Sequence, residues 1–216
     1  MSGGHEVGSI SKLHQDAQFI NDESVEWNRL VGVVYAAINA LTTTWEGEAR
    51  STYVTKVNDA QPDLIELANL LNGLSATLGT VSNMYRVTEE GGDPRQAERM
   101  EPQKFTITDM IKGSGGNDSN FDPNECNERS SEIRESASKL SSILLEVKNS
   151  IDSINSNYSS EFGNLTKNYL EKASEECEEH IKAIDAFGKY LVEEVAPKYS
   201  YIDSATEEMS ESTISQ

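Results

Sequence analysis

Apolar residues recur at spacings of three and four along two long stretches in the first half of the chain, Ile20–Trp45 and Tyr53–Tyr85. This spacing places the apolar side chains on one face of an α-helix. Trp45-Glu46-Gly47 lies between the two stretches, and its glycine supplies the permissive backbone that a tight turn between helices requires. Residues 1–88 are therefore predicted to form a helical hairpin, with a kink or a local restart of the second helix at Pro62.

The pattern returns in the second half of the chain, in the stretches Ile133–Tyr158 and Leu165–Val195. The third stretch repeats the first at a constant shift of 113 positions, so that Tyr158 corresponds to Trp45. Phe162 and Gly163 lie between the third and fourth stretches and are predicted to form the second turn. Residues 129–203 are therefore expected to form a second hairpin. The predicted buried face of its last helix comprises Leu165, Tyr169, Ala173, Cys177, Ile181, Ile184, Phe187, Leu191 and Val195.

Residues 89–128 are rich in glycine and proline and are predicted to be a linker or a long loop, in which Lys104–Ile111 forms a short ordered piece. About 40 residues can travel the length of a bundle of roughly 40–50 Å, whereas a few would join parallel hairpins. We therefore expect an all-α fold in which two long helical hairpins pack as an antiparallel four-helix bundle. Residues 204–216 are rich in Ser, Thr and Glu and are expected to be disordered.

The turn of the first hairpin carries Trp45 and Gly47, and Tyr-x-x-x-acidic combinations close both hairpins. Trp-x-Gly in a hairpin turn, with the tyrosine motif at the end of the second helix, resembles the WXG family of type VII secretion substrates. These are small proteins related to the early secreted antigenic target of mycobacteria. The tyrosine motif is either Tyr85 with Glu89 or Tyr199 with Asp203.

The second hairpin departs from the family pattern, because Tyr158 and the Phe162-Gly163 turn stand where Trp-x-Gly is expected. Members of the family are usually single hairpins that pair as dimers. The resemblance therefore implies a fused pseudo-dimer with one Trp-x-Gly half and one divergent half. In the family, a secretion ATPase reads the tyrosine motif near the Trp-x-Gly turn of the partner. The antiparallel arrangement would bring Trp45 close to Tyr199 in the same way.

The resemblance also implies a localisation and partners. The chain would be made in the bacterial cytoplasm and then secreted or displayed on the cell surface, and its N-terminus lacks the basic and apolar regions of a Sec signal peptide. The expected partner is a secretion ATPase or a co-secreted helical protein. A homodimer formed by exchange of hairpins stays open as an alternative, and so does the question of whether the chain is cargo or carrier.

The formal net charge of -19 argues against nucleic acid and anionic lipids as partners. The most apolar stretch, Leu30–Leu41, is shorter than the roughly 20 residues that span a bilayer, so membrane insertion is not expected. Two alternative functions stay open at this point. One is a helical pore-forming protein in which Leu30–Leu41 unpacks and inserts, and the other is a cytoplasmic coiled-coil adaptor.

The sequence offers no candidate for catalysis, because it contains no glycine-rich phosphate loop and no nucleophile elbow. Cys126 and Cys177 are expected to be free and inert thiols. The three histidines have no metal-ligand spacing with one another or with a cysteine. Residues 118–124 lack the glycine of a calcium loop, which is replaced by Pro123. We therefore expect a non-enzymatic interaction protein without a cofactor or metal.

Overall fold

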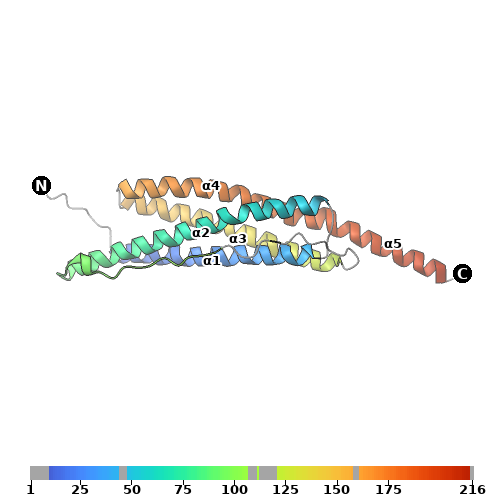
Figure 1. Cartoon of the computed structure of the whole chain (residues 1–216), viewed down its shortest axis with the longest axis horizontal. Helices are drawn as coiled ribbons and strands as arrows, with labels where there is room; N and C mark the ends of the chain where they lie inside the picture. The colour runs from blue at the N-terminus through green and yellow to red at the C-terminus, as the bar shows by residue number, and fades with distance from the viewer. Residues whose placement is uncertain (1–9, 44–47, 107–110, 112–120, 158–160, 215–216) are drawn as a thin grey trace. The chain divides into compact units, whose positions relative to one another are not determined.

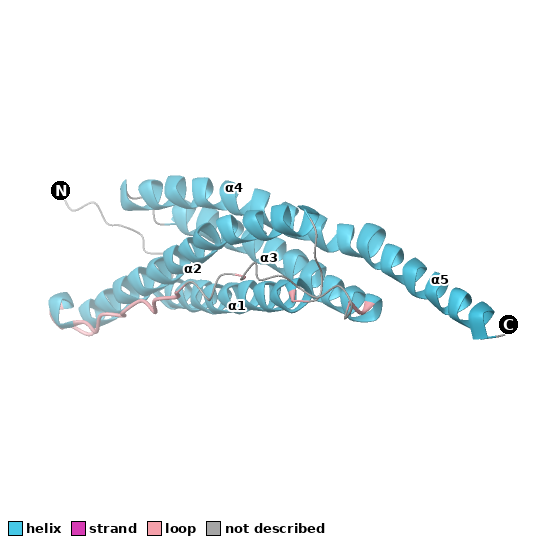
Figure 2. Cartoon of the chain, turned by 45° about the vertical axis from the view of Figure 1, so that its right-hand side comes forward, coloured by secondary structure: helices cyan, strands magenta, loops and turns pink. Residues whose placement is uncertain are grey.

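The computed structural model describes residues 10–43, 48–106, 111, 121–157 and 161–214. Most of these residues are helical, and none of them lies in a strand (Figures 1 and 2). The elements are α1 (Ile10–Thr42), α2 (Glu48–Glu89), the short 3-10 helix η1 (Pro94–Gln96), α3 (Pro123–Asn157), α4 (Glu161–Tyr190), the π-helical turn η3 (Leu191–Val195) and α5 (Ala196–Ile214). The prediction of an all-α fold built from two helical hairpins is confirmed.

The four long helices contribute segments to two compact units. The first unit comprises Met1–Arg29, Pro62–Ile107 and Leu140–Glu178, and the second comprises Leu30–Gln61, Thr108–Lys139 and Glu179–Gln216. In the first unit, the fully buried Trp27 of α1 donates from Nε1 to the carbonyl oxygen of Leu64 in α2 at 2.8 Å. Cys177 Sγ of α4 lies 3.7 Å from the carbonyl oxygen of Asp63. Segments of both hairpins therefore share the interior of the first unit.

The second unit also joins the two hairpins. Tyr53 of α2 packs against Phe187 and Tyr190 of α4, with ring centroids 4.7 Å and 5.2 Å apart. Arg50 is buried and donates from Nη2 to the carbonyl oxygen of Thr42 at 2.7 Å, which ties the start of α2 to the end of α1. The turn end of the first hairpin thus lies in one unit with the open end of the second, as the antiparallel arrangement requires.

The shift of 113 positions that relates α1 to α3 also relates α2 to α4. Buried residues of α2 have buried counterparts in α4 at Val57 and Leu170, Gln61 and Ser174, Leu64 and Cys177, Ala68 and Ile181, Leu71 and Ile184, Leu74 and Phe187, and Leu78 and Leu191. The two hairpins therefore follow one layout, position by position.

Contacts between helices recur at counterpart positions as well. In the first hairpin Ser75 Oγ of α2 donates to the carbonyl oxygen of Ala17 in α1 at 2.6 Å. The counterparts are Gly188 and Ser130, and here Ser130 Oγ of α3 donates to the carbonyl oxygen of Gly188 in α4 at 2.5 Å. The hydroxyl group lies on the second helix of the first hairpin and on the first helix of the second hairpin. In both hairpins it bonds the two helices at counterpart positions.

The chain after α2 turns back along the same helix. Gly91 has a φ of +78°, a left-handed conformation that favours glycine. Its N–H donates to the Thr88 carbonyl at 3.0 Å, and the N–H of Gly92 donates to the Val87 carbonyl at 2.8 Å. This pair of hydrogen bonds is the Schellman motif, which satisfies the last carbonyl groups of a helix and reverses the chain.

Amide side chains of α2 then hold residues 98–105, which we call the strap. Asn69 donates from Nδ2 to the Phe105 carbonyl at 3.1 Å and accepts from the Phe105 N–H at 2.7 Å. Asn72 accepts from the N–H of Gln103 at 2.5 Å. Because each asparagine side chain satisfies backbone groups, the strap is fixed on α2 without forming a helix or a strand of its own. In the second unit, Asn58 holds both backbone groups of Ile111 in the same way, at 3.0 Å and 3.2 Å.

The helix boundaries differ from the predicted ones at three places. α3 begins at Pro123 rather than after residue 128, because Asp122 accepts from the N–H of Asn124 at 2.8 Å and caps the helix one residue before a proline. α2 runs through Pro62 without a restart, held by the fully buried Gln61 and Leu64 on either side. Residues 204–214 continue α5 in the structure, and no glycine or proline follows Pro197 to end the helix.

The predicted buried face of α4 is wrong in its first turns. Tyr169 is 64% exposed, whereas its neighbour Leu170 is 4% exposed. The predicted series Leu165, Tyr169, Ala173 and Cys177 advances by four residues at every step. Four residues turn an α-helix by about 400°, so each step moves the side chain about 40° further from the core. The true face is reached from Leu170 through Ser174, with mixed spacings of four and three.

One described helix is long and apolar enough to cross a membrane, namely the part Arg50–Glu89 of α2, and 61% of its most apolar window is buried inside the protein. This is not the Leu30–Leu41 stretch, most of whose apolar residues belong to the core of the second unit. A buried core helix of a bundle passes the same test of length and composition, so the feature is weak evidence for membrane insertion.

Candidate functional site

The tyrosine motif of the second hairpin lies at the start of α5, in the second unit. The ring of the half-buried Tyr199 is stacked on that of Phe121, with the centroids 4.0 Å and the planes 29° apart. Phe121 is itself buried and immediately precedes Asp122, the capping residue of α3. Asp203 follows Tyr199 by one helical turn. Tyr199 is therefore held against the beginning of α3.

Two large apolar side chains of α5 follow Tyr199 and are exposed. Tyr201 is 75% exposed and Ile202 is 56% exposed. Lys198 is paired with Glu194 one turn earlier, at 3.0 Å between Nζ and Oε2. Aromatic and aliphatic side chains next to charged residues are typical of surfaces that bind other proteins. α5 therefore carries two exposed apolar side chains next to the fixed ring of Tyr199.

The turn η3 connects this site to the core of the second unit. The N–H of Ala196 donates to the carbonyl oxygen of Leu191, five residues earlier, which is the hydrogen bond of a π-helix. Leu191 and Val195, the first and last residues of the turn, are both buried. Because Tyr190 and Ala196 on either side have α-helical backbone angles, α4, η3 and α5 form one continuous helical segment.

The other Tyr-x-x-x-acidic combinations have different surroundings. Tyr85 is half-buried and Glu89 is exposed at the last residue of α2, after which the chain reverses at Gly91. Tyr190 packs against Tyr53, so this residue serves the contact between α2 and α4. The tyrosine of the Tyr190 and Glu194 combination thus packs on α2, whereas Tyr85 lies near the end of α2 and Tyr199 at the start of α5.

Several predicted site residues are not described with side chains. Trp45, Gly47 and Tyr158 lie outside the described residues, and so does the expected approach of Trp45 to Tyr199. The sequence had suggested that Phe162 and Gly163 form a turn between two helices. The structure places both residues in the first turn of α4, which begins at Glu161. An acidic residue and a polar run before the apolar positions are compatible with the start of a helix, which is why the helix begins earlier than the glycine indicated.

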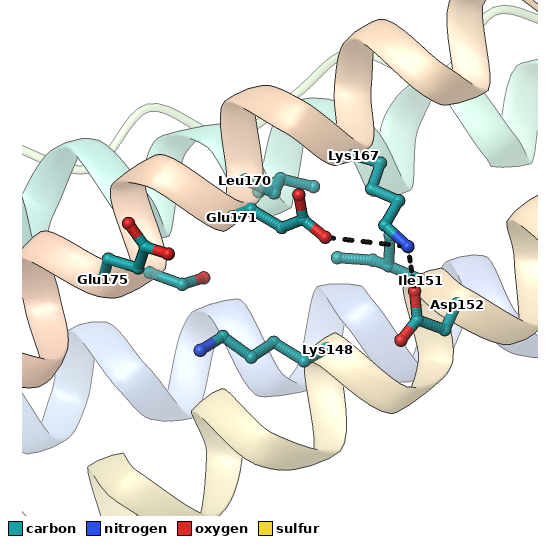
Figure 3. Close-up of a pocket in the computed structure, with 8 residues that line it drawn as sticks. Lys148, Ile151, Asp152, Lys167, Leu170, Glu171 and Glu175 are labelled. Carbon is teal, nitrogen blue, oxygen red and sulfur yellow. Dashed lines mark hydrogen bonds and ion pairs between the residues drawn. The ribbon is translucent and has the colours of Figure 1, made fainter.

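A groove of about 250 Å³ between α3 and α4 contains several charged side chains (Figure 3). Lys167 Nζ lies 2.7 Å from Oδ1 of Asp152 and 3.6 Å from Oε1 of Glu171, and Lys148 is paired with Glu178. The hydrogen bond to Asp152 raises the pKa of Lys167 above its ordinary value. The amine therefore stays protonated at neutral pH and has no lone pair for nucleophilic attack. The groove is a set of ion pairs on the surface of the first unit.

Both cysteines carry free thiols in buried positions. Burial raises the pKa of Cys126 to about 11 and that of Cys177 to about 12. Because the thiolate is the reactive form, both side chains are poor nucleophiles at neutral pH. In the described part of the chain, no group of three or more His, Cys, Asp or Glu side chains is placed to hold a metal ion.

Sequence reasoning did not identify Phe121 or η3 as parts of the site. An aromatic residue directly before an Asp-Pro helix start was the available signal for Phe121, because the residue before a cap often packs against an apolar residue in the first turns of its own helix. The signal for η3 was the spacing of Leu191, Val195 and Tyr199, which advances by four residues twice in succession.

Comparison with known proteins agrees with the architecture of the first hairpin. The family described as "Proteins of 100 residues with WXG", WXG100, matches residues 9–90, which include α1, α2 and the Trp45-Glu46-Gly47 segment between them. Neither the search of curated proteins nor that of solved structures found a match to the chain. The match ends at the residue before the Gly91 reversal. Residues 9–90 are therefore similar to the WXG100 family over the first hairpin, and a second hairpin of the same layout follows in tandem.

Proposed function

We propose that this protein is a non-enzymatic substrate or export partner of a type VII secretion system and acts through protein–protein contacts. The WXG hairpin of residues 9–90 supports this proposal, as does the repetition of its layout in the second hairpin. Tyr199 and Asp203 are the proposed export signal. The stacking of Tyr199 on Phe121 carries this assignment, because it fixes an aromatic side chain beside the exposed residues of α5.

The proposed partner is a secretion ATPase or a co-secreted helical protein. The protein would be made in the bacterial cytoplasm and reach the medium or the cell surface by the type VII route. Trp45 and Gly47 are proposed to act together with Tyr199 as one recognition surface. A net charge of -19 supports a protein partner over nucleic acid. A homodimer formed by exchange of hairpins is the alternative assembly.

Tyr85 with Glu89 is the second candidate for the signal. α2 ends at Glu89, and the chain then returns along α2 as the strap, whereas α5 continues past Asp203 as far as Ile214. A helix that continues past the motif offers more surface to a partner than one that ends at it. We therefore assign the signal to α5.

The assignment is tested by the variants Tyr199→Ala and a truncation before Tyr199. We expect each to reduce the secreted fraction at least about tenfold, the effect of losing roughly 1.4 kcal/mol of binding. The helical circular dichroism should be retained, apart from the loss of α5 in the truncation. Tyr169→Ala, an exposed tyrosine of α4 away from the motif, is the matched control, and Tyr85→Ala tests the other motif. Undiminished secretion of both Tyr199 variants would defeat the assignment.

The length and apolar composition of Arg50–Glu89 favour one alternative function, a membrane-active helical protein. Insertion would require this helix to leave contacts such as the hydrogen bond from Trp27 to Leu64. A purified interaction protein should release no dye from anionic or zwitterionic vesicles. Release at micromolar protein would favour the membrane-active function over the secretion proposal.

A further inference from the structure

The buried residues of α4 and those of α5 do not follow one continuous α-helical spacing, because one additional residue lies between them. Ile184, Phe187 and Leu191 follow each other at spacings of three and four and are buried. Continued in an α-helix, the same face would reach Glu194 and then Lys198. In the structure, both of these side chains are exposed and paired with each other.

The buried face continues instead with Val195 and Ala196, which are 4% and 3% exposed. A π turn holds one additional residue per turn, so the face after η3 is displaced by one position in sequence. Burial of the charged Glu194 and Lys198 would require desolvation of both groups, whereas the π turn leaves them in water. The order of apolar and charged residues therefore favours a π turn at this point.

The repeat locates the additional residue independently. Leu78 and Leu191 are 113 positions apart, as are the other buried pairs of α2 and α4. Beyond η3 the shift becomes 114, and at this shift Tyr85 corresponds to Tyr199 and Glu89 to Asp203. Tyr85 and Tyr199 are also both half-buried. The shift thus changes by one residue across the π turn.

We propose that η3 absorbs a one-residue insertion in the second hairpin and is the element that positions Tyr199 and Asp203. It keeps the tyrosine motif on the face that Tyr85 and Glu89 occupy in the first hairpin. The proposal rests on the proposed function, because it explains how the export signal stays presented despite the insertion. It also predicts that a residue can be removed from η3 without loss of register.

The first variant removes Glu194, which is exposed. The π turn should close to an α-helix, and Tyr199 should stay stacked on Phe121. We expect an unchanged secreted fraction and a Tm within about 3 °C of the parent. Deletion of Lys182, an exposed residue between the buried Ile181 and Ile184, is the matched control. It should lower Tm much more, because the buried Ile184 and Phe187 between the deletion and η3 are rotated by about 100° relative to the core.

The second variant inserts an alanine after Glu194. The turn already holds one additional residue, so a second one should rotate Tyr199 by about 100° away from Phe121. We expect the loss of the nuclear Overhauser contact between the two rings. The secreted fraction should fall at least about tenfold, while the helical circular dichroism is retained.

The outcomes separate the positioning role from the export role. If deletion of Glu194 lowers Tm as much as deletion of Lys182, or disrupts the contact between Tyr199 and Phe121, η3 is not a one-residue insertion. If Tyr199→Ala blocks secretion but the alanine insertion does not, η3 has no positioning role although the export signal stands. If Tyr199→Ala is secreted normally, the export assignment fails, and the ring contact and the Tm values alone decide whether η3 is an insertion.

Discussion

The hydroxyl of Ser130 in α3 donates a hydrogen bond to the carbonyl oxygen of Gly188 in α4. A methyl group on Gly188 would lie 3.3 Å from the Ser130 carbonyl oxygen and 2.6 Å from Cγ of Arg134, so the two helices approach closely here. Ala17 and Ser75 make the equivalent contact in the first hairpin, with the hydroxyl on the other helix. The same packing solution therefore occurs in both hairpins with different residues.

Ser130→Ala should destabilise the protein modestly. The side chain is fully buried, and its loss removes one inter-helix hydrogen bond, which contributes about 0.5–1.5 kcal/mol. In a domain of this size that corresponds to a fall in Tm of roughly 2–5 °C. Ser131→Ala, in the next and exposed position, is the control and should leave Tm within about 1 °C. Equal effects of the two variants would contradict the importance of the Ser130 contact.

Asn69→Ala should release part of the strap from α2. The side chain makes both a donor and an acceptor contact with the backbone of Phe105, and its removal leaves two partly buried backbone groups without partners. We expect a loss of about 1–3 kcal/mol in the free energy of unfolding and faster amide exchange at Phe105. Asn168→Ala, on the exposed face of α4, should be neutral or slightly stabilising, because alanine favours the helix. Unchanged amide exchange in Asn69→Ala would rule out the clamp.

The thiols of Cys126 and Cys177 should react slowly with a disulfide reagent while the protein is folded. With pKa values of about 11 and 12, at most roughly one thiol in a thousand is a thiolate at pH 8. Labelling should therefore be at least about 100-fold slower than in denaturant, where burial is lost. Rapid labelling of the native protein would show that these side chains are accessible.

Removal of the negative charge of Glu23, which lies near Glu146, should make the protein more stable at pH 7. Partial burial of Glu23, followed by the charge of Glu146, raises its pKa in the folded state. The folded protein therefore binds a proton more tightly than the unfolded chain. The ionised carboxylate of Glu23 therefore lowers the free energy of unfolding at pH values above its raised pKa. This destabilisation vanishes below the ordinary pKa of a glutamate.

Glu23→Gln should accordingly raise Tm at pH 7 and have no such effect near pH 3. Because Glu23 is half-buried and solvent still screens its neighbouring charges, the expected gain is about 1 °C, which differential scanning calorimetry resolves. Glu128→Gln makes the same change of charge at an exposed position and serves as the control. A gain in Glu23→Gln that persists at pH 3 would show that its cause is not the ionised carboxylate.

The helical pairs and their antiparallel order could be predicted because burial of apolar stripes leaves a periodic signal in the sequence. Every described residue of the first predicted stripe from Ile20 to Leu41 is buried, including the interrupting Ser24. The fourth stripe failed at Tyr169, because steps of four residues match a helix locally and drift away from the core over several turns. A register shift of one residue is enough to exchange Leu170 for Tyr169.

The candidate site could be predicted only in its outline. Tyr199 and Asp203 were identified from a short motif, but Phe121 and η3 depend on contacts between distant segments, which have no periodicity. The strap is held by asparagine side chains that pair with backbone groups of any sequence, so its composition predicts a linker and not its place of attachment. The change of the shift between α2 and α4 from 113 to 114 positions was present in the sequence and indicates the additional residue in η3.

The central claim is that the two hairpins bury their apolar faces against each other within one chain. Nuclear Overhauser contacts between the Tyr53 and Phe187 rings, recorded with isotope filtering on a mixture of differently labelled chains, test it most directly. We predict a contact between these rings within each labelled chain and none between chains. A contact only between chains would mean that the hairpins are exchanged in a dimer, and the absence of any contact would mean that they do not share a core.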